Sequence, residues 1–170
     1  DSVMAIYDKR GELYNNAVKW IETKGYYGYL FYRGDKAKIP GVIADFEKAV
    51  ELKGAINYQF VPAYFDLVEK NYTLNKAYSP EQVLTIYDKS NKLLDAAGAT
   101  GKDVSGSKAT LETLLVKMKL IDCDFIENTM GPKLAADPTN EELAEQIFTY
   151  SLQYKCISTK AFLAALEFKD

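Results

Sequence analysis

The strongest folding signal in the sequence lies at residues 79–98, SPEQVLTIYDKSNKLLDAAG. Ser79 can cap the first backbone N–H groups of a helix, and Pro80 suits the first helical position, where no hydrogen-bond donor is lost. Gly98 can take the left-handed turn that ends a helix. Between these signals, apolar residues recur at three- and four-residue steps, at Val83, Ile86, Tyr87, Leu94 and Ala97. The segment therefore predicts an amphipathic helix whose apolar face must be buried against other helices.

Several other segments show the same helical period. Pro40 opens one of them and Gly54 closes it, while Pro62 falls in the first turn of the next. Gly131-Pro132 is the expected end of a later helix. No segment alternates apolar and polar residues over five or more positions, so no strand is expected. Besides 79–98, helices are expected at residues 2–23, 40–53, 55–72, 108–130 and 137–168.

Short connectors return the chain beside the helix it has just left. The sequence therefore predicts an all-α protein, an up-and-down antiparallel bundle of four core helices with an additional C-terminal helix. We assign residues 1–130 to the bundle domain and residues 131–170 to a C-terminal helical extension packed on or beside it. The last helix has two apolar stripes, which indicates a central position or one side offered to a partner. The second of these stripes comprises Phe148, Leu152, Phe162 and Leu166.

The composition excludes several classes of function. The sequence has no histidine, which rules out histidine-based nucleophilic triads, histidine zinc sites and histidine haem ligation. Its 21 basic and 24 acidic residues are mixed along the chain, so no basic stripe is available to nucleic acid. There is no phosphate-binding loop and no apolar run of membrane-spanning length. We therefore expect a non-catalytic protein with no cofactor or metal, no nucleic-acid partner and no membrane insertion; the acidic group Asp122, Asp124 and Glu127 is interpreted as a solvated face.

Two cysteines, Cys123 and Cys156, are too few for a thiolate metal cage. They can form one disulfide, which suits an oxidising compartment, or remain two small buried apolar residues; both interpretations are open. The first residue is Asp1 rather than Met, which suggests a processed N-terminus and favours an exported protein. The tripeptide Asn71-Tyr72-Thr73 is an N-glycosylation sequon, which matters only on a eukaryotic secretory route.

Residues 25–41, GYYGYLFYRGDKAKIPG, form the most unusual stretch because five of seven consecutive residues are aromatic. One interpretation is an aromatic surface for a partner or a flat apolar ligand. The favoured alternative is a connector whose rings cover the end of the bundle. The stretch also contains the integrin-type tripeptide Arg33-Gly34-Asp35, although three-residue matches are common by chance.

The helix layout resembles the PsbQ-type extrinsic proteins of photosystem II, and the algal variants most closely. The resemblance rests on a tyrosine-rich, histidine-free sequence with a long first helix, Ile39-Pro40-Gly41 at the second helix and Ser79-Pro80-Glu81 at a capped helix. It covers residues 2–130. It implies a non-catalytic subunit of the thylakoid lumen that docks its soluble face on the membrane complex and supports the oxygen-evolving centre.

Docking would use side chains in or beside loops, because exposed charges steer association. Two alternatives remain open. One is a secreted bundle that encloses a lipid or pigment between its helices, with the aromatic stretch at the mouth. The other is a secreted protein that binds a host protein through Arg33-Gly34-Asp35 or the last helix. The expected docking residues are Lys36, Lys38, Lys102, Lys108, Tyr29 and Tyr32.

Overall fold

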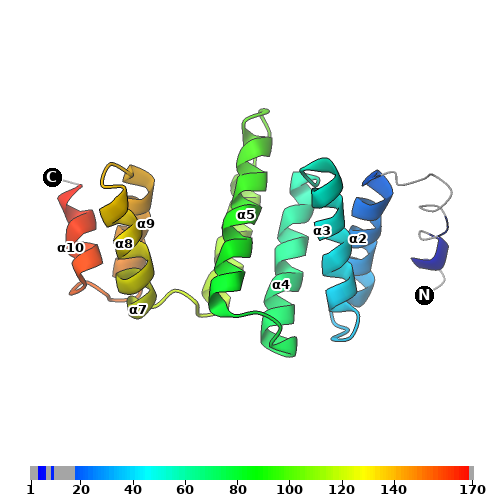
Figure 1. Ribbon diagram of the computed structural model, residues 1–170, viewed down its shortest axis with the longest axis horizontal. Coiled ribbons are helices and arrows are strands. Elements are labelled where there is room, and N and C mark those ends of the chain that lie inside the picture. Colours follow the sequence, from blue (N-terminus) through cyan, green and yellow to red (C-terminus); the bar gives the residue numbers. More distant parts are fainter. Residues whose placement is uncertain (1–3, 7–8, 10–17, 169–170) are drawn as a thin grey trace. The chain divides into compact units, whose positions relative to one another are not determined.

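The computed structural model describes residues 4–6, 9 and 18–168, and the chain divides into two compact units, Asp1–Met118 and Lys119–Asp170 (Figure 1). No strand occurs among the described residues, so the predicted all-α class is confirmed. The closed bundle of four core helices stays a prediction. The units divide at Met118, ahead of the division at residue 130 expected from the sequence, because residues 123–136 belong to a helical run of the second unit.

The first unit is built around one central helix, α4. Successive helices of this unit alternate in direction (Figure 1), and α4 contacts α2, α3, α5 and α6. Most of its side chains from Val61 to Glu69 are buried, including Phe65 and Leu67, which are fully enclosed. The elements of the unit are α2 (Val18–Tyr32), α3 (Ile39–Lys53), the 3-10 turn η1 (Tyr58–Phe60), α4 (Val61–Asn75), α5 (Pro80–Gly98) and α6 (Ser105–Lys117).

Local signals set several of these helix ends as predicted. The Ser79 hydroxyl accepts the N–H of Gln82 at 3.2 Å, and the Gln82 side chain accepts the N–H of Ser79 at 2.8 Å, so α5 begins with a reciprocal capping box. Gly54 ends α3 with a left-handed φ of 78°. The predicted end of α5 is wrong in detail: Gly98 is its last helical residue, and the left-handed φ of 87° falls at Gly101.

All five aromatic residues of the stretch 25–41 lie in helix α2, and the connector is limited to residues 33–38, so the favoured interpretation of that stretch is wrong. Gly25 and Gly28 lie within the unbroken helix α2, and both face α3. A Cβ atom on Gly28 would lie 2.9 Å from a methyl group of Val42, and one on Gly25 would lie 3.2 Å from the ring of Phe46. The two glycines therefore let α2 and α3 approach closely. Most of the helix expected before Val18 falls outside the described residues.

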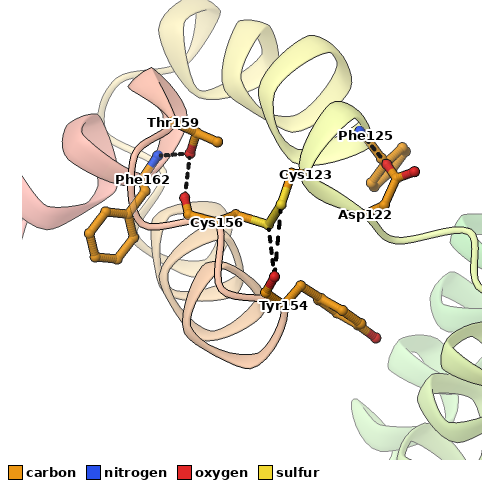
Figure 2. The surroundings of a disulfide bond; sticks show 7 residues. All are labelled: Asp122, Cys123, Phe125, Tyr154, Cys156, Thr159 and Phe162. Atoms are coloured by element: carbon orange, nitrogen blue, oxygen red, sulfur yellow. Dashed lines mark hydrogen bonds between the residues drawn. A yellow bond between two sulfur atoms is a disulfide. The ribbon is translucent and has the colours of Figure 1, made fainter.

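The second unit is a group of short helices joined by a disulfide between Cys123 and Cys156 (Figure 2). The Cα atoms of the two cysteines are 5.3 Å apart, and the bond ties the start of α7 to the loop between α9 and α10. Its core is apolar and includes Ile126, Leu134 and Ile147. The elements of the unit are α7 (Cys123–Phe125), the π turn η2 (Ile126–Met130), α8 (Gly131–Ala136), α9 (Glu141–Gln153) and α10 (Lys160–Glu167).

The single helix expected at residues 108–130 is wrong, because α6 ends at Lys117 and a new helical run starts at Cys123. Asp122 caps that run by accepting the N–H of Phe125 at 2.7 Å (Figure 2). Gly131-Pro132 does not end the run. The π turn η2 has already interrupted the α-helical hydrogen bonds before Pro132, so the missing N–H of the proline breaks nothing further.

The helix expected at residues 137–168 is two helices, α9 and α10. Lys155 takes a left-handed φ of 58° just before Cys156, and Thr159 caps α10 by accepting the N–H of Phe162 (Figure 2). The disulfide holds the chain in this turn. Part of the second apolar stripe packs inside the unit and is not offered to a partner. Phe148 of α9 stacks on Phe162, with ring centroids 5.6 Å apart.

Candidate functional site

The turn between α2 and α3 brings aromatic and basic side chains together. We call residues 29–38 the basic tip. The Arg33 guanidinium lies 5.7 Å from the ring centroid of Tyr29, and the Lys38 ammonium lies 5.7 Å from that of Tyr32. Both distances suit cation–π attraction. The tip also exposes apolar surface at Phe31, which is 58% accessible.

The basic tip carries an excess of positive charge that the described part of the chain does not neutralise. Arg33, Lys36 and Lys38 form no ion pair with a described carboxylate. Asp35 is the only acidic residue of the tip, and one of its carboxylate oxygens accepts the N–H of Ala37 at 3.0 Å. The tip is therefore a surface with a net positive charge, held in shape by a local turn.

The end of α4 supports the basic tip and extends its charge. The Asn75 side-chain amide donates to the Lys36 carbonyl at 3.1 Å, which fastens the tip to the last turn of α4. Lys76 follows immediately, is exposed, and also forms no ion pair with a described carboxylate. A fourth cation thus belongs to the same end of the first unit.

The expected docking residues do not form one surface. Tyr29, Tyr32, Lys36 and Lys38 belong to the basic tip, whereas Lys102 and Lys108 belong to the α5–α6 turn and the start of α6. Because successive helices alternate in direction, that turn lies at the opposite end of the first unit (Figure 1). Lys108 is moreover paired with Asp95, which leaves its charge partly neutralised.

A cleft of about 430 Å³ lies between α3, α4 and α5, and the sequence did not indicate it. The Tyr64 hydroxyl donates to the Glu47 carboxylate at 3.0 Å. Burial, helped by the negative charge of Glu47, raises the pKa of Tyr64 well above its ordinary 10.0, so this hydroxyl remains a donor. Residues 25–41 do not line the cleft; its walls are Phe46, Glu47, Val50, Glu51, Tyr64, Ile86, Lys89, Ser90 and Leu93.

The second unit has an open groove of about 650 Å³ between α8 and α10. Small side chains such as Ala135 and Ala164 leave this space empty. Glu127, which the sequence placed on a solvated face, accepts the N–H of Ala161 at 2.9 Å and so holds the start of α10. Among the described residues, no group of three or more carboxylate or cysteine side chains is placed to hold a metal ion.

The glycosylation sequon is not available in the folded protein. Asn71 lies inside α4 and is 4% exposed, and its side-chain oxygen accepts from the Asn75 amide at 2.7 Å. A glycan at this position would require α4 to open. The tripeptide Arg33-Gly34-Asp35, in contrast, is exposed within the basic tip.

Comparisons with protein-family models, curated proteins and solved structures found no match to this chain. In the described ranges, no helix combines the length and the apolar character needed to cross a bilayer.

Proposed function

We propose that this chain is a non-catalytic docking protein that binds an acidic surface of a larger partner through its basic tip. The observation that carries the proposal is the cluster of Arg33, Lys36 and Lys38 on a turn that offers these cations no described carboxylate partner. Complementary charge steers a partner to such a surface and fixes its orientation. Arginine and tyrosine, which both occur in the tip, are among the residues that contribute most to binding at interfaces.

The tip is built to bind without much loss of conformational freedom. The Asp35–Ala37 turn and the hydrogen bond from Asn75 to Lys36 hold its backbone before a partner arrives. The stacking of Arg33 on Tyr29 limits the conformations of the arginine side chain. A surface that is already ordered pays less entropy on association.

The resemblance to PsbQ-type proteins gives this proposal a specific partner, the lumenal side of photosystem II. In this proposal, the first unit is the up-and-down antiparallel bundle that serves as a rigid scaffold, and the basic tip is its docking end. The Cys123–Cys156 disulfide supports an oxidising compartment, which the thylakoid lumen and the exterior of the cell both provide.

Rebinding to photosystem II membranes stripped by salt washing tests the proposal. The full chain should sediment with the membranes at low salt and dissociate as the salt concentration rises. Reversing one charge in the tip, with Lys36→Glu, should weaken binding at least ten-fold, or about 1.4 kcal/mol. Lys102→Glu, at the opposite end of the unit, is the matched control and should bind like the wild type.

Two results would contradict the proposal. One is the absence of binding to stripped membranes by the wild-type chain at low salt. The other is an equal loss of binding in the tip variant and in Lys102→Glu, because that would indicate an effect of net charge and not a docking surface at the tip.

A further inference from the structure

The cleft between α3, α4 and α5 is not used by the docking proposal. Its apolar walls come from all three helices and include Phe46, Val50 and Ile86. Its volume of about 430 Å³ falls in the range of small-molecule sites, which lie preferentially between the helices of all-α proteins.

Polar side chains line this cleft, and one buried hydroxyl among them has no hydrogen-bond partner among the described residues. The Tyr64 hydroxyl is 3.0 Å from the Glu47 carboxylate and orients it. Ser90 also lines the cleft, is 1% exposed, and its buried hydroxyl has no hydrogen-bond partner among the described residues. A buried hydroxyl in that state costs folding free energy, which a ligand that hydrogen-bonds it can recover.

The geometry points to a small molecule with an apolar body and a protonated amine as the ligand of this cleft. The ammonium group is a hydrogen-bond donor, and both the Glu47 carboxylate and the Ser90 hydroxyl oxygen can accept from it. The aromatic residues Phe46 and Tyr64 line the same space, and aromatic rings attract a cation. The apolar body of the ligand occupies the space beside Val50, Ile86 and Leu93.

The charged groups at the cleft differ in how firmly they are held. Glu47, Glu51 and Lys89 line it. Glu51 is already paired with Lys48 at 3.0 Å, so Glu47 is the carboxylate that remains for a ligand. Glu47 and Lys89 are both exposed, but the hydrogen bond from Tyr64 fixes the Glu47 carboxylate, whereas no ion pair with a described carboxylate fixes Lys89. A charge that is already positioned loses less conformational freedom on binding, so the cleft favours a cation over an anion.

Competition among three ligands of equal chain length tests the inference. The full chain is titrated with decylamine, decanol and decanoate, each kept below its micellar concentration, and each displaces the neutral fluorescent probe N-phenyl-1-naphthylamine. Decylamine should bind at least ten-fold more tightly than the other two. Glu47→Gln, whose amide oxygen still accepts from Tyr64, should weaken decylamine about ten-fold and leave decanol unchanged.

Two further variants locate the binding. Leu93→Trp fills the cleft and should abolish binding of the fluorescent probe and of all three ligands, whereas Leu163→Trp, on an exposed position of the second unit, should change nothing. The inference is overturned if the chain binds none of the ligands, if decanol or decanoate binds as tightly as decylamine, or if Glu47→Gln or Leu93→Trp has no effect. The outcome is independent of the docking proposal, because the basic tip is intact in every variant.

Discussion

Reduction of the Cys123–Cys156 disulfide should strongly destabilise the second unit and leave the stability of the first unit unchanged. Residues 119–170 are fewer than the roughly 70 residues at which a single apolar core usually suffices, so this unit depends on its covalent link. The two cysteines are 33 positions apart in the sequence. For a loop of that length, loss of the link adds about 4 kcal/mol of chain entropy to the unfolded state at 25 °C.

A destabilisation of about 4 kcal/mol is large relative to the total free energy of unfolding of such a unit. A unit of this size has a total stability of about 3–8 kcal/mol. Without the disulfide, the second unit should therefore keep at most about 4 kcal/mol of stability, and at the lower end of the range it should be unfolded in the absence of denaturant. The first unit has no cysteine and should keep its stability.

Two probes separate the units in the full chain. Trp20 is the only tryptophan and lies in α2, so its fluorescence reports the first unit. Hydrogen exchange of peptides from α9 reports the second. Urea titrations are run with and without a phosphine reductant, and a variant with Cys123→Ala and Cys156→Ala shows whether the reductant acts only through the disulfide.

The expected result is a loss of protection in α9 under reducing conditions and an unchanged urea midpoint for Trp20. The reductant should have no further effect on the alanine variant. The reasoning is refuted if α9 loses less than about 1 kcal/mol of protection on reduction, or if the Trp20 transition shifts with it.

Four other substitutions, of which Gly34→Ala is a control, test the packing of the first unit through its urea unfolding. Gly28→Ala should lose about 1–2 kcal/mol, because crowding against α3 costs more than the roughly 1 kcal/mol gained in helix propensity, whereas Gly34→Ala, in open space, should lose nothing. Lys117→Ala should cost about 1 kcal/mol, because it removes the nearer of the two cations beside the buried Glu69 carboxylate, at 3.1 Å, and leaves Lys70 at 3.9 Å; an unchanged midpoint would contradict this. The pKa of Tyr64 is raised in the folded state, so its contribution to stability is complete below pH 10 and falls as the pH rises above that value. In Tyr64→Phe this part of the alkaline loss should disappear, which unfolding free energies at pH 8 and pH 11 would reveal.

Helix starts could be predicted from the sequence where the signal and its effect lie within a few residues. The capping box of Ser79 and Gln82 and the prolines at the starts of α3 and α4 act on their own first turns. Gly54 likewise ends α3 through its own backbone conformation. None of these signals needs a distant partner.

The helix boundaries that were predicted wrongly depend on contacts between residues that are distant in the sequence. Gly28 looks like a helix breaker, but its position in α2 is fixed by Val42 on the next helix. The break between α9 and α10 depends on Cys156, whose partner is far away in the sequence. The effect of Pro132 could not be predicted because it depends on the π turn before it.

The candidate sites also contain residues that local sequence groups together and residues that only the fold brings together. Lys36 and Lys38 could be grouped because they share one turn, but the separation from Lys102 follows only from the alternating helix directions. The α3–α4–α5 cleft unites Glu47, Tyr64 and Ser90 from three helices. No spacing in the sequence indicates that these residues meet.

The π turn at residues 126–130 takes up one residue without turning the helical run to another face. A π turn holds one residue more than the α turn it replaces. Deleting Asn128 would convert the run into a regular helix, and the residues on either side would keep nearly the same faces. Leu134, now 3% exposed, would therefore stay in the interior. Pro132, in contrast, would then lie inside an unbroken helix, where proline costs about 3 kcal/mol. The extra residue is thus what lets a proline lie in the middle of this run.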